Sequence, residues 1–247
     1  MRYLFPALFA LVLGWAAPAA VAAPEAVTLK AADGVEVFGE YSPVEKSKAL
    51  VLLFHQAGSN RGEYAPIVPK LNAEGYSTLA IDQRSGGNYF GRSNQTVKKL
   101  GHSAEYLDAL PDLEAALAWG VQNAHGAPVL VWGSSYSSSL VFLLAAKHPA
   151  GLAGLLSFSP GEYLGGGDTV RRAAAKVEIP VFVTSAKDAE EIGEARKIVA
   201  STASSAKTQF IPKVGGVHGS STLRDDRNAK GAAENWQAVL AFLATVH

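Results

Sequence analysis

The chain has 247 residues, of which 48% are hydrophobic, and this length and composition suit one globular domain with a sizeable core. Its 22 basic and 22 acidic residues balance, so the chain carries no net field that would recruit nucleic acid or an anionic membrane. Cysteine is absent, which excludes disulfide bonds and leaves burial to stabilise the fold.

The first 22 residues are typical of a cleavable signal peptide. Arg2 supplies a positive charge, an apolar run extends to Trp15, and an Ala-Val-Ala sequence ending at Ala22 suits export peptidases. The alternative is an uncleaved N-terminal anchor, although the apolar run is too short to span a bilayer comfortably. We therefore predict an exported protein, periplasmic or extracellular, with one catalytic domain at 23–247 and no stable membrane insertion after cleavage.

After this leader, apolar segments rich in β-branched residues alternate with amphipathic stretches, which is typical of a parallel sheet covered by helices. The segment 26–41 predicts an antiparallel hairpin around the Asp33-Gly34 turn. Buried parallel strands are predicted at 49–54, 77–82, 128–132, 154–158, 180–185 and 208–212. Helices are predicted at 61–75, 103–124, 136–148, 189–204 and 231–246. The glycine-rich segment 159–170 is predicted to be a surface loop.

A cluster of serines follows the third of these parallel strands, and one of them suits a tight turn from strand to helix. In such a turn the apex residue is held in a strained backbone conformation above the sheet, and the residues two before and two after it must be small. Ser135 has Gly133 two positions before it and Ser137 two positions after it. An apex at Ser134 would instead place Trp132 at the crowded position. Ser135 is therefore the predicted nucleophile.

A serine hydroxyl becomes a good nucleophile when a base removes its proton, and six histidines compete for that role. His218 follows the last predicted strand, in a glycine-containing loop that can bring its imidazole over the carboxyl end of the sheet. His218 is therefore the predicted base. Structural, capping or solvated roles are expected for the candidates His102, His125, His148 and His247.

The third catalytic group should be an acid that orients the imidazole and stabilises its charged form. Asp188 comes three residues after the predicted strand 180–185, at the same edge of the sheet, and is the predicted acid. Glu190 and Glu191 are alternatives, but both suit the first turn of the following helix, where carboxylates interact favourably with the helix dipole.

Two backbone donors are expected for the oxyanion that develops during acyl transfer. The first is the N–H of Tyr136, which follows the nucleophile at the start of a helix. The second is the N–H of Ala57, in the turn of small residues within "FHQAGSN". No metal or organic cofactor is expected.

Taken in order, these motifs resemble those of the α/β-hydrolase superfamily, in particular its small secreted bacterial members near the dienelactone-hydrolase-like and short-chain esterase branches. The resemblance covers nearly all of the mature chain and implies a mostly parallel central sheet flanked by helices. The family's oxyanion loop, Asp-x-Arg segment, nucleophile elbow, acid loop and base loop resemble, in that order, "LLFHQAGSNRGEYAPIVPKL", "LAIDQRSGG", "GSSYS", "TSAKD" and "GVHG".

Three departures from the family pattern limit what the resemblance implies. Gln56 stands where the family usually has glycine and could itself contribute a donor, while Ser137 replaces the second glycine of the elbow. Dienelactone hydrolase proper uses a cysteine nucleophile, which this chain lacks, so its substrate is not implied. Asp82 and Arg84 are interpreted as structural residues.

The combined prediction is a serine hydrolase that cleaves small carboxylic esters or thioesters through an acyl-enzyme intermediate. About 21 residues separate the strand ending near Phe158 from the next strand at Pro180, so no large cap domain is expected and the site should be open. A serine peptidase or acyltransferase on the same fold, and a catalytically silent binding protein, are the alternatives. The sequence indicates neither the acyl-chain length nor the oligomeric state.

Overall fold

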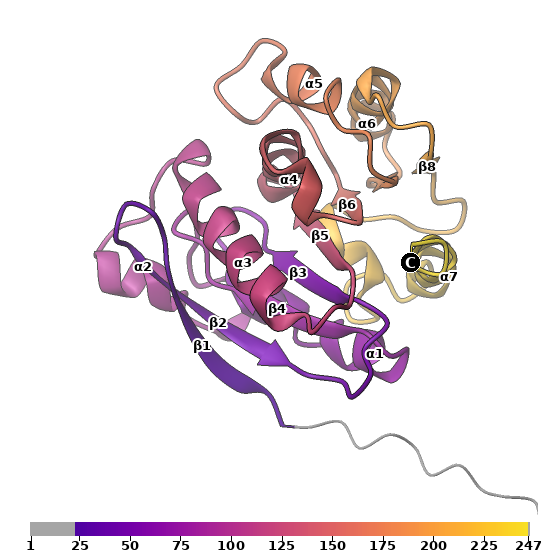
Figure 1. The fold of residues 1–247 in the computed structure, drawn as a ribbon. Helices are drawn as coiled ribbons and strands as arrows, with labels where there is room; N and C mark the ends of the chain where they lie inside the picture. Colours follow the sequence, from indigo (N-terminus) through magenta and orange to yellow (C-terminus); the bar gives the residue numbers. More distant parts are fainter. Residues whose placement is uncertain (1–22, 247) are drawn as a thin grey trace, which may run out of the picture.

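The computed structural model describes residues 23–246, which form one eight-stranded sheet flanked by helices (Figure 1). The predicted signal peptide at 1–22 and His247 lie outside the described residues, so the signal peptide stays a prediction. Among the described residues, no helix combines the length and the apolar character needed to cross a membrane.

The hairpin and all six predicted parallel strands are present. The strands are β1 (Glu25–Lys30), β2 (Glu36–Ser42), β3 (Leu50–Phe54), β4 (Ser77–Ile81), β5 (Val129–Ser134), β6 (Gly154–Phe158), β7 (Val181–Thr184) and β8 (Lys207–Phe210). Their order across the sheet is β1-β2-β4-β3-β5-β6-β7-β8. The hairpin strand β2 pairs antiparallel with β1 and β4, and every other pairing is parallel.

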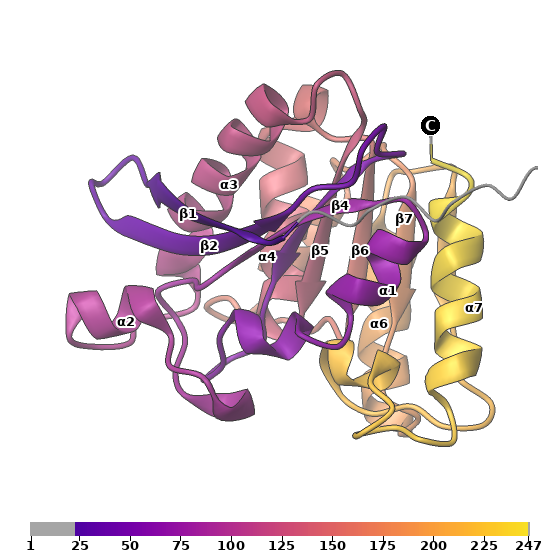
Figure 2. The same cartoon turned by 90° about the horizontal axis from the view of Figure 1, so that it is seen from below.

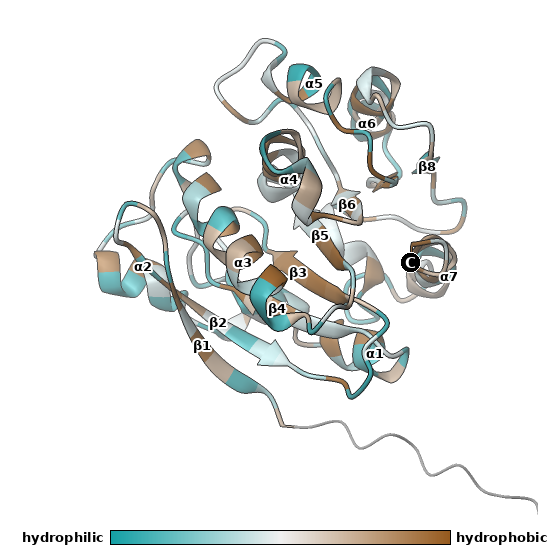
Figure 3. Cartoon of the chain, viewed as in Figure 1, coloured by the Kyte–Doolittle hydropathy of each residue, from teal (hydrophilic) through white to brown (hydrophobic). Residues whose placement is uncertain are grey.

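The parallel strands β3 to β7 are buried along their whole length because both faces of the sheet are covered. The edge strand β8 was predicted to be buried, but its residues are exposed or half-buried. Successive side chains of a strand point to opposite faces. On β3, Leu50, Leu52 and Phe54 therefore join one buried cluster, and Val51 and Leu53 join the other. Figure 3 shows β3 brown along its length, whereas β2 carries paler and teal positions where the hairpin reaches the edge of the sheet.

The helices divide between the two faces of the sheet (Figures 1 and 2). The elements are α1 (Val68–Ala73), α2 (Gln95–Leu100), α3 (Leu110–Asn123), α4 (Tyr136–Lys147), α5 (Thr169–Ala174), α6 (Ala189–Ser201) and α7 (Ala232–Leu243). Helices α3 to α6 contribute to the cluster on one face, and α1 and α7 contribute to the cluster on the other. This two-sided cover is the predicted layer arrangement.

Two predicted helices are shorter in the structure. The segment 61–75 forms a 3₁₀ turn at Arg61–Tyr64 and then α1, instead of one continuous helix. The segment 103–124 becomes regularly helical only at Leu110, because Pro111 lacks an N–H and suits the first turn of a helix. In both cases proline sets the start of the α-helix.

Helices α2 and α5 were not predicted. Each has six residues, too few to show a clear helical period. Helix α2 is fixed by its ends instead: the Asn94 side chain accepts a hydrogen bond from the Val97 N–H, and Gly101 ends the helix in the left-handed conformation. Helix α5 begins within the segment predicted as a loop at 159–170, so that loop ends earlier than expected.

The register of the parallel strands brings four loops to one edge of the sheet. Phe54 pairs with Gly133, Ser134 with Phe158, and Phe158 with Thr184, so the carboxyl ends of β3, β5, β6 and β7 are level. Strands β3 and β5 are neighbours in the sheet although β4 lies between them in the chain, so the order of the strands reverses there. Ligands in open α/β sheets bind at the carboxyl ends of the strands at such a reversal. Within the described residues, α5 is the only helix between β6 and β7, which agrees with the expected absence of a large cap domain.

Candidate active site

The turn between β5 and α4 places Ser135 at its apex. Ser135 has φ 57° and ψ −124°, a combination that a residue other than glycine rarely adopts, and α4 begins at the next residue. A Cβ atom added to Gly133 would lie 2.2 Å from the carbonyl oxygen of Ser137, so only glycine fits there. The structure thus contains the strand-to-helix turn that the serine spacing predicts.

Two hydrogen bonds connect Ser135 to a histidine and a carboxylate. Nε2 of His218 lies 2.8 Å from Oγ of Ser135, and Nδ1 of His218 lies 2.6 Å from Oε1 of Glu191. The hydrogen bond to Glu191 raises the pKa of His218 above its ordinary value, against the opposing effect of burial. Burial would raise the pKa of Glu191, but hydrogen bonds from His218 and Ser159 hold it below its ordinary value. The imidazole is therefore oriented by a carboxylate that stays ionised near neutral pH.

Asp188, the predicted acid, does not occupy this place. It is the N-cap of α6, and its Oδ1 accepts a hydrogen bond of 2.9 Å from the backbone N–H of Glu191. Aspartate followed three residues later by glutamate is a known signature of a helix start, and Asp188 and Glu191 match it. The alternative Glu191 lies in the first turn of α6, as the sequence indicated, and its side chain is also long enough to reach His218. Glu190 is exposed.

The two predicted oxyanion donors belong to segments at the same edge of the sheet as Ser135. The Tyr136 N–H is at the N-terminus of α4, and the Ala57 N–H is in the loop after β3, the strand next to β5. Neither amide is hydrogen-bonded to another residue of the described chain. The neighbouring Gln56 N–H is already used, because it donates to Oε2 of Glu63 at 2.8 Å. The arrangement leaves two backbone donors available for a developing anion.

The Ser137 hydroxyl, whose role the sequence left open, is hydrogen-bonded to groups other than the nucleophile. Its Oγ donates to the His55 carbonyl at 2.6 Å and accepts from Nε2 of Gln83 at 2.6 Å. The same Gln83 amide donates to the Tyr136 hydroxyl at 3.0 Å, and its Oε1 accepts from the His55 N–H at 2.8 Å. Ser137 therefore ties the elbow to the loop after β3.

Sequence reasoning missed Gln83 and Glu63, both fully buried beneath the site. A signal for Gln83 is its position just after β4, where parallel strands present their carboxyl ends to ligands. A signal for Glu63 is that it precedes Tyr64, the first of the buried apolar residues that continue through Ile67 and Leu71. Neither residue matches a motif that would have drawn attention to it.

Asp82 has the structural role that the sequence suggested. It is buried, and its carboxylate accepts hydrogen bonds of 2.8 Å from the backbone N–H groups of Arg61 and Gln95. It also forms an ion pair with the Arg61 side chain. These contacts attach the loops after β3 and β4 to each other.

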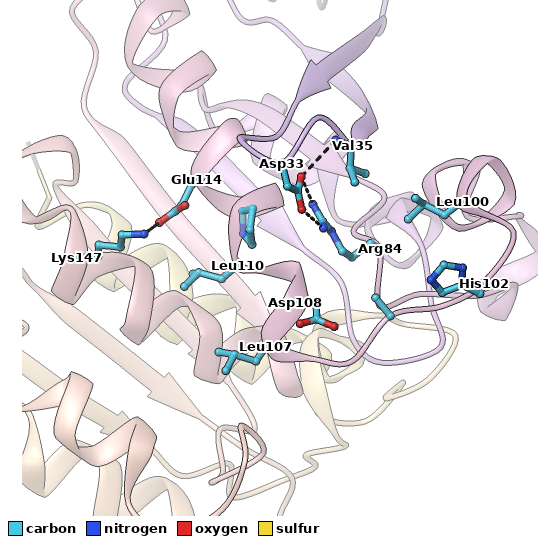
Figure 4. A pocket seen from close by; sticks show the side chains of 12 residues that line it. Asp33, Val35, Arg84, Leu100, His102, Leu107, Asp108, Leu110, Glu114 and Lys147 are labelled. Carbon is cyan, nitrogen blue, oxygen red and sulfur yellow. Dashed lines mark hydrogen bonds and ion pairs between the residues drawn. The ribbon is translucent and has the colours of Figure 1, made fainter.

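Arg84 is also structural. Its guanidinium pairs with Asp33 and Asp112, and Nε lies 2.9 Å from Oδ1 of Asp112. A cavity of about 540 Å³ opens beside it, and Figure 4 shows the paired Arg84 and Asp33 together with His102 in its wall. Ser135 does not line this cavity, and the charge of Arg84 is already satisfied by its two carboxylates.

Comparisons with known proteins agree on the architecture. Residues 45–163 match the family model described as serine aminopeptidase, S33. A dienelactone hydrolase from Anabaena variabilis superposes with a TM-score of 0.69 at 16% identity, covering 91% of this chain and 98% of that chain. An esterase from Pyrococcus furiosus has a TM-score of 0.69 at 18% identity, with coverages of 91% and 93%.

A third solved structure, a soluble variant of the monoglyceride lipase from Saccharomyces cerevisiae in complex with a substrate analog, has a TM-score of 0.67. It is 15% identical and covers 91% of this chain and 95% of that chain. No curated protein sequence matches the chain. The likeness to these structures is therefore one of fold, and it extends over nearly the whole described chain.

Proposed function

Because this chain has the α/β-hydrolase fold, we propose that it is a serine hydrolase that cleaves carboxylic esters or thioesters. Ser135 is the nucleophile, His218 the general base and acid, and Glu191 the carboxylate that orients the imidazole. The observation that carries this proposal is the hydrogen-bond chain of 2.8 Å and 2.6 Å from Ser135 through His218 to Glu191.

The reaction follows from the positions of these atoms. Nε2 of His218 takes the proton of Ser135 as Oγ attacks the substrate carbonyl carbon, and Glu191 stabilises the imidazolium that forms. The carbonyl oxygen becomes an oxyanion that accepts hydrogen bonds from the N–H groups of Ala57 and Tyr136. The imidazolium then protonates the leaving alcohol or thiol as the tetrahedral intermediate collapses to an acyl-enzyme. Water activated by the same imidazole releases the carboxylic acid.

The exposure of the site favours substrates whose ester or thioester group is accessible. The His218 side chain is 43% exposed, and Ser135 is only half-buried. The neutral imidazole is the active base, so kcat/KM should rise with pH through the pKa of His218 in the free enzyme. Because Glu191 raises that pKa, the rise should lie above the ordinary pKa of histidine.

The family model described as serine aminopeptidase supports a second candidate, a peptidase acting through the same three residues. Esters and peptides differ in the leaving group that His218 must protonate. Turnover of p-nitrophenyl esters beside aminoacyl p-nitroanilides separates the two. Faster cleavage of the anilides would favour the peptidase.

The decisive experiment is labelling with a fluorophosphonate probe together with turnover of a p-nitrophenyl ester series. Wild-type protein should be labelled, and Ser135→Ala should lose labelling and at least about a thousandfold in kcat. Ser139→Ala is the matched control, since this nearby buried serine donates to the Gly161 carbonyl at 2.6 Å and should label like wild type. Labelling or turnover that survives in Ser135→Ala would overturn the proposal.

A further inference from the structure

A fully buried carboxylate, Glu63, lies beneath the candidate site and is not used by the reaction described above. Both of its oxygens accept hydrogen bonds. Oε1 lies 2.6 Å from the Ser134 hydroxyl, and Oε2 lies 2.8 Å from the backbone N–H of Gln56. A buried carboxylate without partners would be strongly destabilising, so these contacts determine where the group can sit.

Each partner of Glu63 is one peptide unit away from a group of the reaction. Gln56 precedes Ala57, which supplies an oxyanion donor, and Ser134 precedes the nucleophile Ser135. Fixing the Gln56 amide and the Ser134 side chain therefore fixes the peptide units that carry the donor and the nucleophile. The loop after β3 and the loop after β5 are held by one carboxylate.

The Ser134 hydroxyl extends this connection to the histidine loop. While it donates to Glu63, its oxygen accepts a hydrogen bond of 2.9 Å from the backbone N–H of Ser220, two residues after His218. The approach is close: a Cβ atom added to Gly219 would lie 2.4 Å from Oγ of Ser134. Glu63 is thus linked to all three loops that carry Ala57, Ser135 and His218.

The charge of Glu63 also acts on the imidazole. Burial raises the pKa of Glu63 to about 7, against its hydrogen bonds and the positive groups Arg224 and His218. The Arg224 guanidinium donates to the Glu63 backbone carbonyl at 2.9 Å and not to its carboxylate. The other titratable groups that face Glu63 are the buried phenols of Tyr64 and Tyr136, which are neutral near pH 7. Ionised Glu63 favours the charged form of His218 together with Glu191 and the more remote Asp188.

We propose that Glu63 is a positioning residue that holds the Ala57 amide and the His218 loop in register with Ser135, and that its negative charge stabilises the imidazolium during acyl transfer. This role rests on the proposed serine hydrolase function. It assigns two separable properties, geometry and charge, to one side chain.

Two substitutions separate these properties. Glu63→Gln keeps the length of the side chain: its amide oxygen can accept from the Gln56 N–H and its NH₂ group can donate to Oγ of Ser134, but the charge is lost. Glu63→Asp keeps the charge and shortens the side chain by one methylene, so both contacts cannot be made at once. Asp112→Asn is the matched control, because Asp112 is equally buried and hydrogen-bonded but pairs with Arg84.

The full-length protein is assayed by ester turnover and by the rate of fluorophosphonate labelling across pH. Glu63→Asp should lose about ten- to a hundredfold in kcat with little change in KM, because small displacements of reacting groups have effects of this size. Glu63→Gln should move the acid limb of kcat/KM to lower pH by about half a unit, because the imidazolium loses a stabilising charge. Asp112→Asn should lose stability and keep the wild-type acid limb.

The outcomes distinguish this inference from the proposed function. Absence of Ser135-dependent labelling overturns the proposed function and this inference with it. A different set of results overturns this inference alone. In that case Ser135-dependent labelling is intact, Glu63→Gln keeps the wild-type acid limb, and Glu63→Asp keeps the wild-type kcat. If a variant does not fold, the dependence of kcat/KM on pH in the wild-type protein still tests the role of the Glu63 charge. An acid limb that fits the ionisation of His218 alone would overturn the role of the charge, and one that requires a second ionisation near pH 7 supports it.

Discussion

The two halves of the candidate site are held in different ways. On the nucleophile side, Ser137, Gln83 and Glu63 are fully buried and join the elbow to the loop after β3. On the acid–base side, the side chains of His218 and Glu191 are 43% and 21% exposed, and they meet through one hydrogen bond. The first half is part of the folded core, whereas the second is assembled near the surface from the first turn of α6 and the loop that carries His218.

This difference separates stability from chemistry. Buried hydrogen-bonded groups are expensive to disturb, because a removed partner leaves a polar atom unsatisfied. Exposed ion pairs contribute little to stability, typically about 1 kcal/mol or less. Substitutions on the acid–base side should therefore reduce the rate and spare the fold, whereas substitutions in the buried contacts of the nucleophile side should reduce stability.

The largest effect is expected for Glu191→Gln. Loss of the carboxylate that orients the base should lower kcat by about a hundred- to ten-thousandfold, with a melting temperature close to wild type. Because Glu191 raises the pKa of His218, its removal should also move the acid limb of kcat/KM to lower pH. Ester turnover across pH and thermal unfolding measure the two effects.

Asp188→Asn is the matched control for this substitution. Asparagine caps helices as well as aspartate does, so α6 should keep its start and kcat should stay within about twofold of wild type. Equal losses in Asp188→Asn and Glu191→Gln would contradict the assignment of Glu191 and show that the first turn of α6 acts as a unit.

A large effect on stability is expected for Gly133→Ala. The added methyl would overlap the Ser137 carbonyl, 2.2 Å away, in backbone that cannot yield easily. The free energy of unfolding should fall by about 3 kcal/mol or more. Gly193→Ala, in α6, where the new Cβ would meet no atom beyond the neighbouring residues and the backbone of its own helix, should keep stability or raise it by up to about 1 kcal/mol. Denaturant unfolding of both variants tests the contrast, which would fail if the two were equally stable.

The smallest effect is expected for Ser137→Ala. The Gln83 amide loses an acceptor and the His55 carbonyl loses a donor, so the free energy of unfolding should fall by about 1–2 kcal/mol. Turnover should stay within a few-fold of wild type because the hydroxyl is hydrogen-bonded to His55 and Gln83 and not to Ser135. A loss of kcat as large as that of Glu191→Gln would mean that Ser137 acts on the nucleophile directly.

The fold was predictable because its signals are local. Buried parallel strands are continuous apolar segments, and each predicted parallel strand lies within one or two residues of its place in the structure, although the edge strand β8 is not buried. The short helices α2 and α5 were not predictable from periodicity, since six residues cover fewer than two helical turns. Their ends, such as Asn94 and Gly101, were the available signal.

The site was predictable where backbone geometry restricts which residues fit. It was not predictable where it depends on side-chain contacts between residues that are distant in the chain. The spacing of Gly133 and Ser135 indicated the elbow because only small residues fit that turn. The choice between Asp188 and Glu191 depended on side-chain length and on which of the two residues caps α6. The spacing of these residues along the chain determines neither property. The buried contacts of Glu63 join loops that the sequence does not place together.

The position of Glu191 in the first turn of α6 restricts the length of the connection that precedes it. Successive residues of an α-helix are rotated by about 100° around its axis, so one residue added or removed before the turn would point the carboxylate away from His218. The β7–α6 connection is therefore a spacer of fixed length. A change there would disconnect the acid from the base while leaving the sheet, the elbow and the oxyanion amides in place.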